Sequence, residues 1–173
     1  MATKFSAVME LRLLAEEALD VTVDPGSDGT LPVEVTIGSG GARWANGGAS
    51  GQVGACYKRL RTVGISGTDS YDLLAAGALK TPAGATIDAD ELKGLVLKVT
   101  SGACKLQAPA ASGLGIFTAA SQGLQLSATG GLRSVALYFG PDGLDVTTNS
   151  KFDIVESSGA ATATYELILI VAE

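Results

Sequence analysis

The sequence predicts an all-β protein, an antiparallel β-sandwich, from three observations. Near the C-terminus, Tyr165–Val171 is apolar at alternate positions on both faces of a strand, interrupted by Glu166. About eight to ten short apolar runs are separated by turn signals, and the chain contains 23 glycines. No convincing helix separates these runs, so parallel βαβ units are not expected. Because a strand that is apolar on both faces belongs inside a sheet, Tyr165–Val171 is predicted to be a central strand.

Residues 1–32 are predicted to form an N-terminal segment or arm with the first strands, ahead of a sandwich domain over residues 33–173. Alternation across Ala7–Leu14 favours a strand, which continues after a bend through Leu19–Val23. The same stretch is rich in good helix formers, so a short helix is the alternative. Val33–Ile37 is the next predicted strand.

Gly38–Gly54 is predicted to be a long loop that holds the only tryptophan of the chain, Trp44, together with Asn46. A loop of this length inside a compact domain is usually functional or mobile. A large apolar side chain in a glycine-rich loop is typical of an interface anchor. The alternative, equally weighted, is that Trp44 packs beneath its own loop. The N-terminal segment and this loop are therefore the expected contact elements.

Ala55–Ile65 is predicted to be a strand that carries the densest basic cluster of the chain. Alternation places Lys58 on one face and Arg59 and Arg61 on the other. This arrangement suits ion pairs on a sheet face or a docking patch for an acidic partner. The candidate interface residues are Trp44, Asn46, Tyr57, Arg59 and Arg61.

Further strands follow at intervals typical of sandwiches and barrels. They are expected at Tyr71–Leu74, Leu92–Thr100, Cys104–Gln107, Leu124–Ser127, Arg133–Phe139, Leu144–Thr147 and Phe152–Glu156. Cys104–Gln107 is expected to return beside Leu92–Thr100 as its hairpin partner. Ala108–Ser121 is a second long loop. One core is predicted to hold Leu95, Leu97, Val135, Leu137, Leu167 and Leu169.

Composition and charge argue against several classes of function. The net charge of −6 disfavours a nucleic-acid-binding surface, because phosphate binding needs a basic face. The chain has no histidine, so the usual general base and metal ligand are missing. No run reaches the length of a membrane span, and no signal peptide pattern is visible. We expect no cofactor, no metal, no direct nucleic-acid contact, no membrane association, and reduced, unbridged Cys56 and Cys104.

Two motifs that could carry chemistry are weak. The glycine-rich Gly38–Gly54 stretch lacks the Gly-Lys-Ser/Thr ending of a phosphate loop and leads into a strand. Asp88, Asp90 and Glu91 crowd carboxylates without the ligand spacing and central glycine of a calcium loop, which favours a solvated turn. A serine or cysteine nucleophile would lack its ordinary histidine base. We therefore expect that the protein is not an enzyme.

Several motifs taken together resemble a known family. They are Trp44-x-Asn46-Gly47-Gly48 with Gln52, the strand Tyr57–Val63, Ser70-x-Asp72-Leu73, LKGLVLKV from Leu92, Gly130-Gly131 before Arg133–Phe139, Pro141–Val146, and the closing strand. The pattern resembles the capsid decoration or cement proteins of tailed bacteriophages. These are small structural proteins with a jelly-roll-like β-sandwich. The resemblance covers roughly Val33 to the C-terminus, and it implies a jelly-roll fold with no active residues.

The resemblance implies a virion structural protein that binds the outer surface of the major capsid protein lattice and stabilises the shell, as a homo-oligomer. Such a protein would lie on the capsid exterior after assembly in the host cytoplasm. One alternative is a phage tail or head-fibre component that binds a host surface glycan. A second is a β-sandwich lectin or carbohydrate-active enzyme, which the scarce aromatic residues and missing histidines disfavour. Fold alone does not decide among them.

Overall fold

The computed structural model describes the backbone of residues 7–9, 11–15, 31–35, 42–46, 52–75, 77–80 and 86–173, with side chains from Val53 onward in those ranges. The regular structure of these residues consists of β-strands. They are β1 (Ala7–Met9), β2 (Leu11–Ala15), β3 (Leu31–Val35), β4 (Ala42–Asn46), β5 (Gln52–Val53), β6 (Ala55–Val63), β7 (Thr68–Asp72), β8 (Glu91–Ser101), β9 (Ala103–Gln107), β10 (Gly123–Ser127), β11 (Ser134–Tyr138), β12 (Leu144–Asp145), β13 (Lys151–Glu156) and β14 (Ala163–Ala172).

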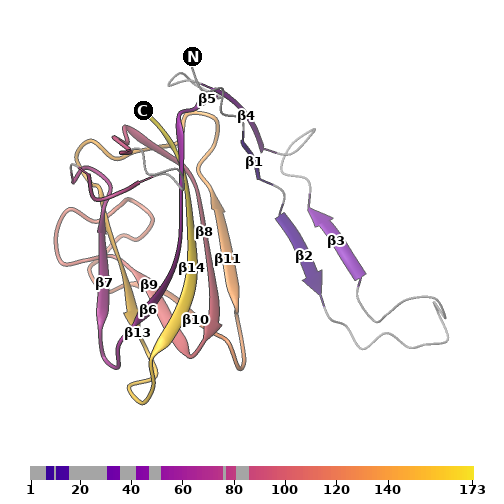
Figure 1. The fold of residues 1–173 in the computed structure, drawn as a ribbon, viewed down its shortest axis with the longest axis vertical. Helices are drawn as coiled ribbons and strands as arrows, with labels where there is room; N and C mark the ends of the chain where they lie inside the picture. The colour runs from indigo at the N-terminus through magenta and orange to yellow at the C-terminus, as the bar shows by residue number, and fades with distance from the viewer. Residues whose placement is uncertain are drawn as a thin grey trace. The chain divides into compact units, whose positions relative to one another are not determined.

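The strands from β6 to β14 form two antiparallel sheets that pack face to face as a β-sandwich (Figure 1). The five-stranded sheet has the order β11-β8-β14-β6, with the short β12 paired to the start of β8. The four-stranded sheet has the order β10-β9-β13-β7. The predicted fold class, an all-β antiparallel sandwich, is therefore confirmed.

The strand pairing is nested in the manner of a jelly roll. The first sandwich strand, β6, pairs with the last, β14, and β7 pairs with β13. Inside these pairs, β8 pairs with β11, and β9 pairs with β10. One long antiparallel hairpin is thus wound into two sheets, which is the jelly-roll arrangement that closes a sandwich core.

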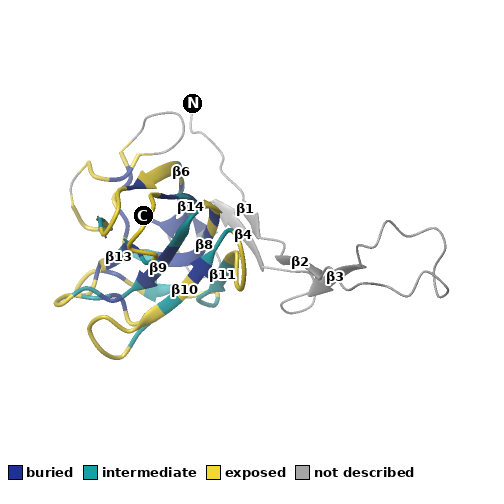
Figure 2. Ribbon diagram, turned by 90° about the horizontal axis from the view of Figure 1, so that it is seen from below, coloured by how far each residue is buried: buried dark blue, intermediate teal, exposed yellow. Residues whose placement is uncertain are grey.

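The closing strand β14 lies at the centre of the five-stranded sheet, between β8 and β6, as predicted. Its inward residues Tyr165, Leu167 and Leu169 have no exposed surface, because the four-stranded sheet covers them. Figure 2 shows the buried residues concentrated between the two sheets. Four of the six predicted core leucines and valines are fully buried; Val135 and Leu137, on the edge strand β11, are partly buried against the same core.

The prediction that Cys104–Gln107 is the hairpin partner of Leu92–Thr100 is wrong. The strand β9 pairs with β10 and β13 in the opposite sheet. The chain changes sheets at Gly102, which has a φ of +70°. A Cβ atom at this glycine would lie 2.4 Å from the carbonyl oxygen of Thr162. A Ser-Gly turn signal fits a hairpin as well as a crossover, and the distant partner strands decide between them.

The N-terminal part of the chain contains strands where the alternation predicts them. Val8–Arg43 forms one compact unit, and Met1–Ala7 with Trp44–Glu173 forms the other. In the first unit, β2 pairs with β3 antiparallel, with Leu11 opposite Val35 and Leu13 opposite Val33. The strand interpretation of Ala7–Leu14 therefore holds over β1 and β2 in place of a helix, while Leu19–Val23 lies outside the described residues. The division between residues 32 and 33 stays a prediction.

The predicted loop Gly38–Gly54 is not irregular throughout. It contains β4 and the two-residue β5, which pair in parallel with Ala45 opposite Gln52 and Asn46 opposite Val53. Period-2 alternation is weak in this stretch because most of its residues are glycine, alanine or serine. The sequence pattern therefore indicated a loop where short strands are present.

Candidate interface at the β6 edge

The strand β6 forms one edge of the five-stranded sheet, and we refer to its nine residues, Ala55–Val63, as the β6 edge. The turn after Val63 leads directly into β7, which is an edge strand of the other sheet. The N–H of Gly67 donates to the carbonyl of Gly64 at 2.9 Å and closes this turn. Both edges therefore flank the same side of the sandwich, and residues pointing inward from β6 meet residues pointing inward from β7.

The carboxylate of Glu156 fixes the turn between β6 and β7. Its Oε2 accepts the N–H of Ser66 at 2.9 Å, and its oxygens also accept the N–H of Gly159 and both the N–H and the hydroxyl of Ser158. Hydrogen bonds from the Ser158 hydroxyl and from these backbone groups lower the pKa of Glu156 to about 2. One side chain therefore joins the β6–β7 turn to the β13–β14 turn.

Aromatic rings form the inner wall of the β6 edge. Tyr57 is buried, and its ring contacts that of Tyr71 edge to face, with the centroids 6.2 Å apart. Tyr71 in turn stacks on Phe152, with the centroids 4.9 Å apart. The guanidinium carbon of Arg59 lies 5.7 Å from the centroid of Tyr57, within the range of a cation–π interaction. The ring of Tyr57 therefore supports a cation at the rim of the sandwich.

A polar network closes the seam between the two sheets next to this wall. The hydroxyl of Tyr165 donates to Oδ2 of Asp69 at 2.5 Å, and its oxygen lies 2.7 Å from the hydroxyl of Tyr71. Since the single proton of Tyr165 is directed to Asp69, Tyr71 donates to Tyr165. Nε of Arg61 lies 3.7 Å from Oδ2 of Asp69, and this carboxylate raises the pKa of Arg61. Burial is the main cause that raises the pKa of both tyrosines.

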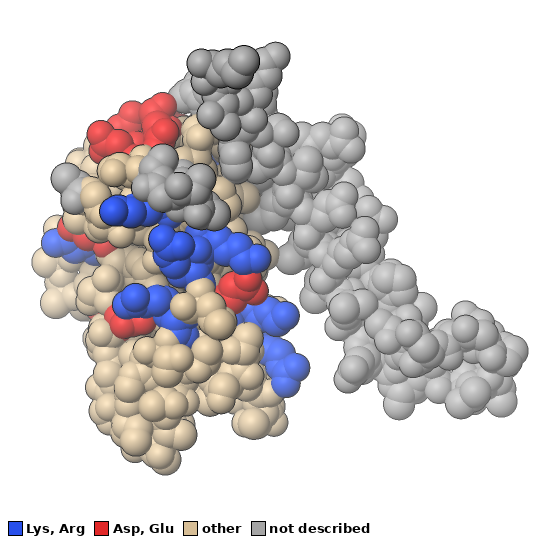
Figure 3. Space-filling model, viewed as in Figure 1, with Lys and Arg blue, Asp and Glu red and all other residues tan. Residues whose placement is uncertain are grey.

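The outward face of the β6 edge combines charge with an exposed leucine. Nζ of Lys58 pairs with Glu166 of β14 at 2.9 Å, and this hydrogen bond raises the pKa of Lys58. Leu60 follows two residues later with 68% of its surface exposed, the highest value among the large exposed hydrophobic residues of the described chain. Thr62 contacts Thr164 through a 3.0 Å hydroxyl pair. Figure 3 shows Lys and Arg side chains gathered over this part of the sandwich.

Three of the five candidate residues chosen from the sequence meet at this edge. Tyr57, Arg59 and Arg61 lie on its inner side, and Lys58 lies on the opposite face, as the alternation predicts. Trp44 and Asn46 belong to β4, and their side chains lie outside the described residues. Sequence reasoning missed three partners, Asp69, Tyr71 and Tyr165, and it missed the exposure of Leu60. Alternation on β7 places Asp69 and Tyr71 on one face, but no local signal connects them to Tyr165.

The charged groups of the β6 edge differ in how they are paired. Arg59 has no carboxylate partner among the described residues, and its guanidinium contacts the ring of Tyr57. Oδ2 of Asp69 accepts from Tyr165 and lies near Arg61, so this oxygen is occupied. Within the described ranges, no group of three or more Cys, Asp or Glu residues has a geometry that could hold a metal ion.

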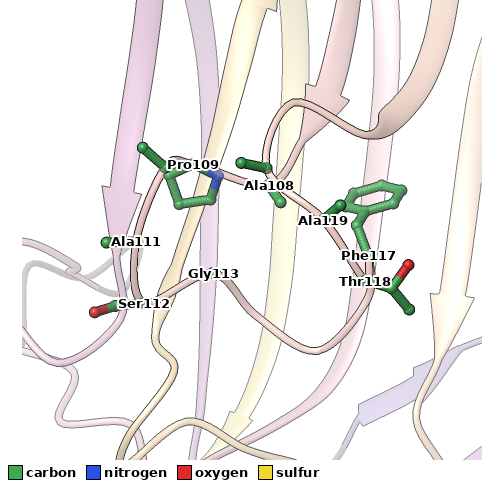
Figure 4. Close-up of a pocket in the computed structure, with 10 residues that line it drawn as sticks. Ala108, Pro109, Ala111, Ser112, Gly113, Phe117, Thr118 and Ala119 are labelled. Atoms are coloured by element: carbon green, nitrogen blue, oxygen red, sulfur yellow. The ribbon is translucent and has the colours of Figure 1, made fainter.

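A hollow lies within the loop between β9 and β10 (Figure 4). Its volume is about 180 Å³, and it is lined by Ala108, Pro109, Ser112, Phe117 and Thr118 together with neighbouring alanines and Gly113. The hydroxyl of Thr118 already donates to Gln122 at 2.9 Å. No charged residue lines the hollow. A ligand site needs a few convergent polar groups to orient its ligand. The polar side chains that line this hollow are those of Ser112 and Thr118 alone.

Comparison with known proteins gives no further guide to the site. No family model matches the sequence, and a search of the curated proteins finds no match. No helix in the described part of the chain is long and apolar enough to cross a membrane.

Proposed function

We propose that this protein is a virion structural protein that binds the outer surface of a tailed-phage capsid and stabilises the shell, as a decoration or cement protein. The observation that carries the proposal is the β6 edge, in a chain of net charge −6. It presents Lys58 and the exposed Leu60 on its outward face, and Arg59 and Arg61 at the rim of its inward face. An edge strand that carries cations and an exposed apolar side chain suits binding to an acidic protein face. The motif resemblance supplies the identity of that partner, the major capsid protein.

The jelly-roll topology supports the proposal by analogy. Jelly rolls are common among viral capsid domains and lectins, and the fold alone selects neither. The mechanism needs no cofactor and no chemical step. A protein that binds the assembled shell and not the free subunit stabilises the assembly by mass action. Many equivalent copies, themselves assembled as homo-oligomers, allow each single contact to be modest.

The test is co-sedimentation of the purified protein with undecorated shells. We expect saturable binding at a fixed number of copies per shell. Binding should not require nucleic acid, so empty shells should bind as well as filled ones. No co-sedimentation with shells, together with saturable binding to a host surface glycan, would overturn the proposal and favour the adhesin.

A matched pair of variants connects this binding to the β6 edge. Leu60→Glu places a carboxylate between Lys58 and Thr62, whereas Leu132→Glu changes a leucine that is 44% exposed outside β6. We expect Leu60→Glu to weaken shell binding about fivefold or more, since loss of a central interface residue costs above about 1 kcal/mol. Leu132→Glu should bind as the wild type does. Equal binding by the wild type and both variants would show that the β6 edge is not part of the interface.

A further inference from the structure

In the part of the chain that the structure describes, β6 pairs with a neighbouring strand on one side only. β6 pairs with β14 from Ala55 opposite Val171 to Val63 opposite Ala163, without a shift in register. In an antiparallel pair, alternate residues direct their N–H and C=O groups away from the partner strand. Among the described residues, no strand pairs with β6 on its other side. Such an edge is a template for one more strand.

The β6 edge is long and regular, and its protection against strand addition consists of the charged side chains of Lys58, Arg59 and Arg61. Its nine residues contain no proline and no bulge toward β14. The other full-length edge strands of the sandwich, β7, β10 and β11, have five residues each. Short strands, prolines, bulges and charged side chains are the common means by which proteins block an edge, and of these β6 has only the charges, which an acidic strand would neutralise. β6 is therefore the strand of the described sandwich best suited to accept a partner strand.

The side chains of β6 determine what kind of strand would fit. The outward row presents Lys58, Leu60 and Thr62, and the inward row presents Arg59 and Arg61 at the rim. Residues opposite one another on paired strands interact directly, and opposite charges are favourable there. A partner strand would place carboxylates beside the cations and an apolar residue beside Leu60. An extended segment rich in acidic residues, with an apolar residue at its centre, matches both rows.

We infer that the β6 edge binds an extended acidic segment of the shell protein as an added β-strand of the five-stranded sheet. The inference rests on the proposed function for the identity of the partner. Main-chain hydrogen bonds along β6 supply affinity, and the cations with Leu60 supply specificity, as in other strand-addition complexes. Side-chain docking on β6 without strand addition would leave the edge amides unpaired.

Hydrogen exchange of the full-length protein, free and bound to undecorated shells, tests the inference. We expect the amides of alternate residues in Ala55–Val63 to exchange at about one tenth of the free rate, or more slowly still, when the protein is bound. The edge strand β10 serves as the internal control and should exchange equally in both states. Under the same conditions, shell-bound protein with no slowing in β6 would overturn strand addition while leaving the proposed function intact.

Two other outcomes separate the inference from its premise. Absence of any shell-bound protein would refute the proposed function itself, and the inference with it. Slow exchange of alternate β6 amides in the free protein at high concentration, with faster exchange on dilution, would identify a second copy as the added strand. That result would overturn the assignment of the shell protein as the partner.

Discussion

A single hydroxyl group, that of Tyr165, connects the two sheets at the β6 side of the sandwich. It donates to Asp69 and accepts from Tyr71, and both tyrosines are buried. Replacing Tyr165 by Phe would leave the carboxylate and the Tyr71 hydroxyl without this partner. We expect Tyr165→Phe to lower the free energy of unfolding by about 1–3 kcal/mol, measured by urea denaturation.

Tyr57→Phe is the matched control, because Tyr57 packs in the same wall and its hydroxyl has no hydrogen-bond partner within the described residues. Its free energy of unfolding should stay close to the wild-type value. If the two variants were equally stable, the hydroxyl network would contribute nothing to the seam.

The carboxylate of Glu156 makes the stability of the turns depend on pH. Its pKa is about 2 in the folded protein, against an ordinary value of 4.5, so the folded state favours the charged form. The contribution is fully present above the ordinary pKa and is lost as the pH falls toward 2. Glu156→Gln should therefore be less stable than the wild type at pH 7, and the difference should shrink between pH 4.5 and pH 2.

Urea denaturation of both proteins across this pH range gives the measurement. Other acidic groups titrate in both proteins alike, so the difference isolates Glu156. If the difference in free energy of unfolding between the two proteins stayed constant from pH 7 to pH 2, the negative charge of Glu156 would not be the cause of its contribution.

At the scale of the strand, Gly102 directs the crossover from β8 to β9. Its φ of +70° disfavours a side chain, and a Cβ would meet the carbonyl oxygen of Thr162. We expect Gly102→Ala to lower the free energy of unfolding by about 1–3 kcal/mol. Gly130→Ala is the control, since a Cβ at Gly130 would have open space within 4 Å and the residue has no positive φ. Thermal unfolding of the two variants should separate them clearly, and coincident melting curves would contradict this role of Gly102.

Strand positions were predictable because burial determines a period of two in the sequence. The closing strand shows this best, because its two apolar faces indicate a central position before any partner is known. The same alternation placed Lys58 on one face of its strand and Arg59 and Arg61 on the other face. Pairing partners were less predictable, as β9 shows, because local turn signals do not identify which distant strand completes a sheet. The glycine-rich stretch around β4 and β5 carried too little alternation to reveal strands.

Only those residues of the candidate site that lie on one strand were predictable from the sequence. Tyr57, Arg59 and Arg61 share one strand and could be grouped from sequence alone. Asp69 and Tyr165 are separated by 96 residues, and only the nested pairing of β6 with β14 and β7 with β13 brings them together. The exposure of Leu60 depends on β6 being an edge strand, which a single sequence does not indicate.

At the scale of the whole molecule, the net charge is negative, whereas the β6 edge carries three basic residues. If that edge binds an acidic shell surface, salt should weaken the complex. The screening length falls from about 10 Å at 0.1 M ionic strength to about 3 Å at 1 M. We expect the affinity for undecorated shells to fall about tenfold or more over this range, measured by co-sedimentation. Affinity that is unchanged or higher at 1 M salt would indicate an apolar contact elsewhere on the molecule.

The most direct test of the account is the heat resistance of undecorated shells with and without this protein. Binding to the assembled state alone predicts that the temperature of shell disruption rises as protein is added and stops rising at a fixed number of copies per shell. Leu132→Glu should reproduce this rise, and Leu60→Glu should need a higher concentration to reach it. A disruption temperature that does not change at saturating protein would contradict the proposal that the chain is a capsid-stabilising protein.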